Sequence, residues 1–195
     1  MNTPKEYKDN LSKGIITDQM VSDVAFTYDA RAGYYQERER EALIRPSLGY
    51  SPSSFRRKIE DLQAKMARIL KLWSQPTCIH VVYQKWIDTY FEDEEGYDEN
   101  ASDIVEMGML PISSDNSKNF IAYQNIAHKR PSYFYCYEIA GRSFDVPISE
   151  KEATGYTGLK ITIRPEREKG WWLYNTLPMH FADIILGMVE NREKK

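Results

Sequence analysis

A seam of large apolar residues between positions 55 and 73 constrains the fold of this chain more than any other feature. Its members follow one another at intervals of four, three, four, three and four, the spacing of a helix that buries a single face. They are Phe55, Ile59, Leu62, Met66, Ile69 and Trp73. Ser51 to Ser54 supply capping oxygens and a first-turn proline, and Pro76 ends the pattern. We therefore predict one long helix that packs through this seam.

The partner of this helix is predicted just upstream, where a second apolar stripe has the same period. After a polar leader, Thr17 is placed to cap the upstream helix. Its core positions are Met20, Val21, Val24, Ala25, Tyr28, Ala32 and Tyr35. Pro46 and Gly49 interrupt the chain between the two stripes. Residues 1–75 are accordingly predicted to form an antiparallel helical hairpin.

Beyond Pro76 the periodicity becomes that of strands, with β-branched and aromatic residues in short runs. The predicted strands are 78–87, 104–112, 120–127, 133–140, 143–148, 158–163 and 170–174. We predict an α+β fold, in which the N-terminal helical hairpin precedes a mostly antiparallel β-sheet and a C-terminal amphipathic helix over 177–189. Residues 76–195 would contain the sheet, an acidic insertion at 92–106 and the closing helix, in one compact unit with residues 1–75.

The composition limits the class of protein. With 42% hydrophobic and 13% aromatic residues, the chain has the material for a packed core and is unlike a disordered protein. No run approaches the roughly 18 apolar residues of a membrane span, and the polar N-terminus is unlike a signal peptide. Two cysteines are too few for a disulfide framework. We therefore expect a cytoplasmic protein that does not contact a membrane.

Acidic side chains are concentrated in the middle of the chain. Residues 76–115 carry one basic and 10 acidic side chains, whereas 1–75 carry 13 and 10 and 116–195 carry 12 and 9. The candidate partner-binding residues are Glu92, Asp93, Glu94, Glu95, Asp98, Glu99, Asp103 and Glu106. Such a surface resembles the phosphates of nucleic acid and can occupy a basic groove on a protein partner. The alternatives are a solvated charged loop and a cation site, but the calcium-loop alternation is absent.

A basic and aromatic set of residues points to direct binding of nucleic acid instead. It consists of Arg57, Lys65, Arg68, Lys129, Arg130, Tyr133 and Tyr135. Single-stranded nucleic acid is bound by rings that stack on bases and by cations that pair with phosphates. Alternate aromatic residues on a strand nevertheless point into the core, and an isoelectric point of about 5.7 is far from basic.

Cys78, His80, His128 and Cys136 are the residues from which a zinc site could be assembled. Cys78 and His80 are two positions apart on a predicted strand, so their side chains share one face. Neither the Cys-x₂-Cys nor the His-x₃-His spacing is present. We therefore predict no metal and no cofactor, and interpret the cysteines as two buried thiols.

Common catalytic motifs are missing from the sequence. It contains no G-x-S-x-G, no glycine-rich phosphate loop, no H-E-x-x-H and no kinase signature. We therefore predict a protein without enzymatic activity and no catalytic residues. An active site assembled in space from scattered Asp, Glu and His side chains stays open as an alternative.

Several N-terminal stretches resemble uncharacterised proteins of Gram-positive bacteria and their mobile elements, over roughly the first 80 residues. They are residues 14–20, 28–32, 37–41 and 76–80. The resemblance implies a phage or mobile-element context and supplies no activity. Together with the charge pattern, it leads to the hypothesis of an anti-CRISPR or similar anti-defence inhibitor. The acidic surface would block a host nucleoprotein machine, at a groove that ordinarily holds phosphates.

Overall fold

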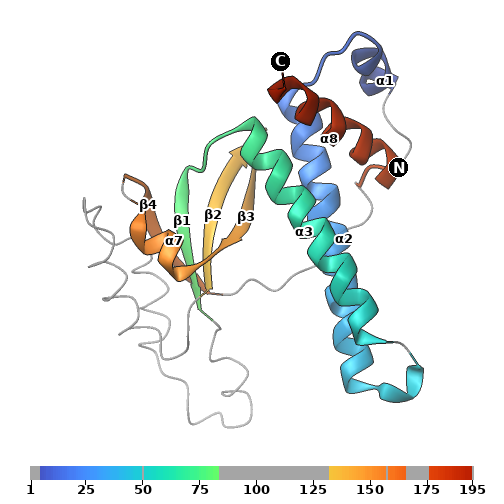
Figure 1. The fold of residues 1–195 in the computed structure, drawn as a ribbon, viewed down its shortest axis with the longest axis vertical. Coiled ribbons are helices and arrows are strands. Elements are labelled where there is room, and N and C mark those ends of the chain that lie inside the picture. The colour runs from blue at the N-terminus through green and yellow to red at the C-terminus, as the bar shows by residue number, and fades with distance from the viewer. Residues whose placement is uncertain (1–4, 50, 84–131, 157, 166–175, 195) are drawn as a thin grey trace. The chain divides into compact units, whose positions relative to one another are not determined.

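The computed structural model describes residues 5–49, 51–83, 132–156, 158–165 and 176–194 (Figure 1). These residues fall into two compact units. The helical unit draws on residues 1–75, 138–144 and 169–195, and the sheet unit on residues 76–137 and 145–168. Four predictions lie outside the described residues: the strands 104–112, 120–127 and 170–174 and the acidic insertion 92–106.

The predicted helical hairpin is confirmed. Helix α2 spans Asp18–Ile44 and α3 spans Pro52–Trp73, with the short 3₁₀ turn η1, Pro46–Leu48, between them. The two helices run antiparallel and pack side by side (Figure 1). The Thr17 hydroxyl accepts a hydrogen bond from the Met20 backbone N–H at 3.3 Å, so the predicted N-cap is present. The turn ends at Gly49, whose φ of 71° lies in the left-handed region that glycine tolerates.

Within the polar leader, for which the sequence predicted no element, Lys5–Ser12 forms helix α1. Periodicity could not indicate it, since Tyr7 is its single buried residue. The Tyr7 hydroxyl donates a hydrogen bond to Asp23 on α2. Helix α1 therefore contacts α2 through this hydrogen bond and has no apolar stripe of its own.

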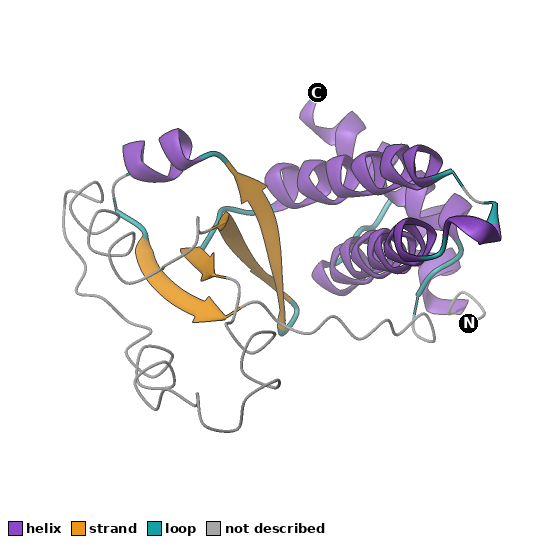
Figure 2. Cartoon of the chain, turned by 90° about the horizontal axis from the view of Figure 1, so that it is seen from below, coloured by secondary structure: helices purple, strands orange, loops and turns teal. Residues whose placement is uncertain are grey.

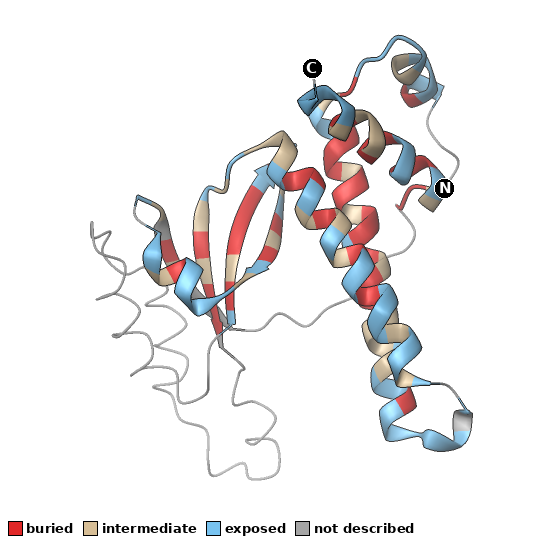
Figure 3. Cartoon of the chain, viewed as in Figure 1, coloured by how far each residue is buried: buried red, intermediate tan, exposed pale blue. Residues whose placement is uncertain are grey.

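The core of the helical unit lies along the predicted seam. Ile59, Leu62, Met66 and Ile69 are buried, and Figure 3 shows buried residues on both α2 and α3. The closing helix α8, Met179–Glu193, also belongs here, because it packs on both α2 and α3. Its buried residues are Phe181, Ala182, Ile185, Leu186 and Val189. The helical unit therefore extends beyond the predicted boundary at residue 75.

The sheet unit contains the predicted mostly antiparallel sheet (Figure 2). Its strands are β1 (Cys78–Tyr83), β2 (Ser132–Ile139), β3 (Arg142–Ile148) and β4 (Lys160–Pro165), in the order β3-β2-β1-β4. Strand β1 pairs antiparallel with β2 and parallel with β4. Ala140 and Gly141 connect β2 to β3 in a two-residue turn with φ values of 49° and 77°. Positive φ at both positions is typical of the type I′ turn.

The two faces of the sheet differ in chemistry. One face is apolar and includes Ile79, Val81, Tyr133, Tyr135 and Ile161, all buried. Helix α7, Glu150–Gly155, lies near this face, because the Tyr156 ring at its C-terminal end stacks edge-on against Tyr135 with centroids 5.6 Å apart. Strand alternation places Cys78 and His80 on the opposite face.

No helix among the described residues is both long and apolar enough to cross a membrane.

Candidate metal centre

Two cysteines and a histidine meet on the polar face of the sheet. Cys78 and His80 are neighbours on that face of β1, and the strand register places Cys136 of β2 directly opposite Cys78. The two sulfur atoms and a ring nitrogen of His80 all lie within 4.8 Å of one another. In the described part of the chain, this is the one cluster of cysteine, histidine or acidic residues close enough to hold a metal ion.

A carboxylate on the third strand fixes the histidine. The Nδ1 atom of His80 lies 2.8 Å from Oδ1 of Asp145, and the two side chains are only 14% and 18% exposed. In the two-residue β2–β3 hairpin, the residues next to the turn pair with each other, which places Asp145 opposite Cys136. Asp145 therefore approaches the cluster from the side of β3.

The groups around Cys78 stabilise the thiolate form of its side chain. A hydrogen bond with the Cys136 thiol lowers the pKa of Cys78 far below its ordinary value, and His80 and Thr77 act in the same direction. Burial opposes them, because it disfavours the charged form. The thiolate is the form of cysteine that attacks electrophiles and binds metals.

The two cysteines differ in exposure. Cys136 is buried, with 1% of its surface exposed, whereas Cys78 is half-buried. Thr77, next to Cys78, holds the backbone of the other cysteine, since its N–H donates to the Cys136 carbonyl at 2.8 Å. The Thr77 hydroxyl donates to the same oxygen at 3.3 Å. The strands are thus held together beside the two sulfur atoms.

A buried hydroxyl lies on the same face. Thr162 of β4 pairs with His80 in the parallel register, and paired residues of neighbouring strands project to the same side. Its Oγ1 atom is buried and has no hydrogen-bond partner among the described residues. Buried hydroxyls normally have a partner, so the hydroxyl could accommodate a polar ligand near the cluster.

The three residues of this cluster were candidate zinc ligands in the sequence, from which no metal was predicted. The structure brings Cys78, His80 and Cys136 together, while His128 lies outside the described residues. Asp145 was missed, because nothing local distinguishes it from a surface carboxylate. The useful signal was the Cys-x-His spacing, which on a strand puts both side chains on one face.

The structure leaves little support for the proposed nucleic-acid residues that it describes. Tyr133 and Tyr135 are each 6% exposed and belong to the apolar face. Lys65 pairs with Asp61 and Asp183, both at 3.3 Å, and Arg68 pairs with Glu190. Arg57 is exposed on α3. Lys129, Arg130 and all eight acidic candidates between Glu92 and Glu106 lie outside the described residues.

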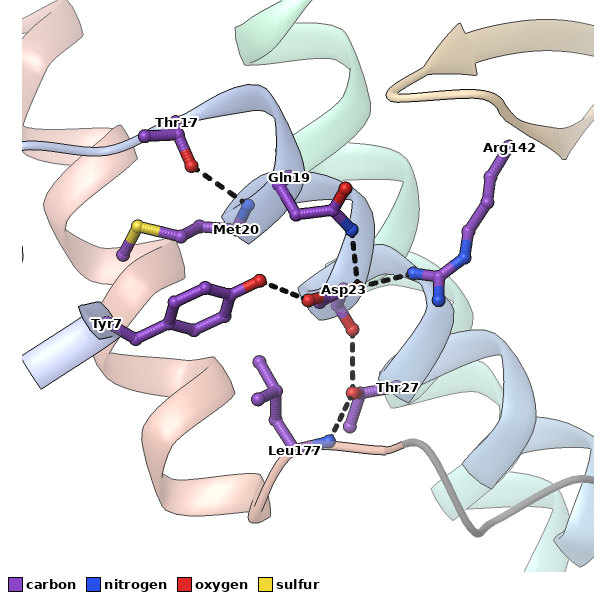
Figure 4. A network of polar contacts seen from close by, with 8 residues as sticks. All are labelled: Tyr7, Thr17, Gln19, Met20, Asp23, Thr27, Arg142 and Leu177. Carbon is purple, nitrogen blue, oxygen red and sulfur yellow. Dashed lines mark hydrogen bonds and ion pairs between the residues drawn. The ribbon is translucent and has the colours of Figure 1, made fainter. Parts of the chain in front are cut away.

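A separate polar network, centred on Asp23, lies in the helical unit (Figure 4). The Asp23 carboxylate accepts hydrogen bonds from Tyr7, Gln19 and Arg142. The Thr27 hydroxyl donates to the Asp23 carbonyl at 2.7 Å and accepts from the Leu177 N–H at 2.9 Å. Because these groups satisfy one another, we interpret the network as structural.

Comparison with known proteins does not assign this chain to a family. No protein-family model, no curated protein and no solved structure matches this chain.

Proposed function

We propose that this protein binds one zinc ion through Cys78, His80 and Cys136. The observation that carries the proposal is the convergence of two sulfur atoms and one imidazole nitrogen within 4.8 Å. Sulfur and imidazole donors suit zinc, whereas calcium and magnesium require oxygen ligands. With Zn–S bonds of about 2.3 Å, a tetrahedral site sets its sulfurs about 3.8 Å apart. Side-chain rotations that close the cluster by about 1.3 Å at most would therefore satisfy zinc.

Asp145 supports the proposal as a positioning residue. Zinc-binding histidines commonly donate their second ring N–H to a carboxylate, which fixes the tautomer and the ring orientation. The contact between His80 Nδ1 and Asp145 matches this arrangement and would leave Nε2 for the metal. Loss of such a partner lowers metal affinity about 10- to 100-fold.

Zinc at this position would stabilise the sheet unit. It would tie β1 to β2 in the middle of the sheet, and its binding free energy would add to the folding free energy. Zinc at 100 times its dissociation constant stabilises a folded protein by about 2.7 kcal/mol. The three described ligands leave one tetrahedral position for water or another ligand.

The test measures zinc per chain in the purified protein, and cobalt substitution as a spectroscopic check. We expect close to one equivalent of zinc and, with cobalt, sulfur-to-metal charge-transfer absorption. Cys78→Ser and Cys136→Ser should abolish that absorption, and His80→Ala should weaken binding. The matched control is His180→Ala, because His180 is exposed on α8. Zinc content that is unchanged in Cys78→Ser, or a wild-type protein that binds neither metal, would overturn the proposal.

A second comparison separates positioning from general charge. Asp145→Asn should raise the zinc dissociation constant about 10- to 100-fold. Glu138→Gln, which removes an exposed carboxylate from β2, should leave it unchanged. Equal effects of the two substitutions would show that Asp145 acts only through its charge.

The charge distribution supports a separate proposal for a partner. The acidic residues between Glu92 and Glu106 would bind a protein that ordinarily holds nucleic acid, as an anti-defence inhibitor does. This proposal rests on the sequence, and zinc binding in the sheet unit neither requires nor excludes it.

A further inference from the structure

The metal-binding cysteines are also placed to form a disulfide. Cys78 and Cys136 are direct partners in the antiparallel ladder. The Cα atoms of such partners are about 4.5–5.5 Å apart, within the range of about 4.4–6.8 Å that a disulfide spans. No disulfide joins them in this structure. The bond could therefore form without rearranging the strands.

We propose that Cys78 and Cys136 form a reversible disulfide and that its formation releases the zinc ion. The release rests on the zinc proposal above, whereas formation of the disulfide does not. A sulfur that enters a disulfide is no longer a thiolate and no longer a ligand. Of the three described ligands His80 alone would remain, too few to retain zinc. The same pair of atoms would thus hold the metal under reducing conditions and expel it under oxidising ones.

The oxidant is a low-molecular-weight disulfide, and the exchange proceeds in two steps. The Cys78 thiolate attacks one sulfur of the oxidant, forming a mixed disulfide and expelling one thiolate. The Cys136 sulfur then attacks the Cys78 sulfur, forming the internal disulfide and expelling the second thiolate. The two cysteines lose two electrons, and the oxidant gains them as two thiolates, which become thiols by taking up the Cys136 proton or a proton from water. In the zinc-bound protein, both cysteines react as thiolates and Zn²⁺ leaves.

Burial assigns the two roles. Half-buried Cys78 is accessible to the oxidant, whereas Cys136, at 1% exposure, is not. Cys78 should therefore react first and Cys136 should resolve the mixed disulfide. Two equally accessible thiols would react with the oxidant in no fixed order.

The experiment treats the zinc-loaded full chain with oxidised glutathione. Intact mass identifies the products, and a chromogenic chelator reports free zinc. We expect the loss of two hydrogen atoms, release of all bound zinc, and recovery of both after a thiol reductant and zinc are added. Cys136→Ser should stop at a glutathione adduct on Cys78, and Cys78→Ser should resist modification until it is unfolded.

Each outcome separates this inference from the zinc proposal. Zinc-loaded protein that accumulates adducts on both cysteines, without an internal disulfide, would overturn the disulfide and leave zinc binding intact. An adduct on Cys136 before Cys78 would overturn the assigned order. Metal-free protein that forms the internal disulfide but never binds zinc would overturn the zinc proposal, and with it the release, while supporting the disulfide.

Discussion

Asp23 is the acceptor on which three segments of the helical unit converge, so its replacement tests how that unit is held together. Arg142, the first residue of β3, and Tyr7 of α1 both donate to the Asp23 carboxylate on α2. The Asp23 and Arg142 side chains are 17% and 33% exposed, so water screens their attraction only in part. Arg142 also lies over the Phe26 ring, 4.6 Å from its centroid. We predict that Asp23→Ala destabilises the helical unit markedly.

The magnitude follows from the exposure of the pair. Hydrogen bonds to charged groups contribute about 1.5–3 kcal/mol, and fully exposed ion pairs about 0–1 kcal/mol. The partly exposed pair with Arg142 therefore contributes about 1.5–2 kcal/mol, and the Tyr7 hydrogen bond about 1 kcal/mol more. Asp23→Ala should lower the free energy of unfolding by about 3 kcal/mol. Asp23→Asn should cost about half as much, because its amide retains one acceptor oxygen.

Urea unfolding followed by circular dichroism measures these changes, through midpoints at unchanged slope. A double-mutant cycle with Arg142→Met isolates the charged contact, because methionine can still pack on Phe26. We expect a coupling energy of about 1.5–2 kcal/mol. Asp9→Ala, which removes an exposed carboxylate from α1, is the control and should change stability by less than about 0.5 kcal/mol. If Asp23→Ala and Arg142→Met are additive within about 0.5 kcal/mol, the reasoning fails.

Other predictions concern pH, the core and the acidic segment. Burial and a hydrogen bond to Asp183 raise the pKa of Tyr28, and burial with the charge of Glu152 raises the pKa of Tyr135 to about 12. The folded pKa values exceed the unfolded value of about 10. The protonated hydroxyls of Tyr28 and Tyr135 therefore stabilise the fold fully below about pH 10, and this contribution is lost as the pH rises above that value. The melting temperature should fall as the pH rises from about 10 to 12, less steeply in Tyr28→Phe, and parallel profiles would contradict this. Ile59→Ala in the seam should cost about 2–5 kcal/mol in urea unfolding, whereas Leu43→Ala, 64% exposed, should cost less than about 0.5 kcal/mol, and similar losses would refute the seam as core. Replacing Glu92, Asp93, Glu94 and Glu95 with uncharged residues should weaken binding to a nucleic-acid-handling partner. Unchanged binding at several salt concentrations would show that this segment does not bind the partner. Tight, salt-sensitive binding of single-stranded oligonucleotides, measured by fluorescence anisotropy, would favour the nucleic-acid alternative instead.

Local patterns were sufficient for the long helices and for the described strands. The spacing from Phe55 to Trp73 and the cap at Thr17 depend on residues a few positions apart, which is the range over which helical geometry acts. The short helices α1 and α7 were missed, because neither is long enough to show a periodic apolar face. Helix α8 was predicted, but its packing on α2 and α3 depends on contacts that periodicity does not identify.

The sequence alone determined, through the seam from Phe55 to Trp73 and the apolar stripe upstream of it, that this protein contains a helical hairpin. The change of period after Pro76 determined that strands follow. Only the tertiary structure decided that Cys136 lies opposite Cys78, because strand register is set by pairing between distant segments. A shift of one residue would turn Cys136 to the apolar face and separate it from His80. Asp145 joins the cluster for the same reason, through the two-residue turn that fixes β3 beside β2. The identities of the cluster residues were local information, and their meeting was not.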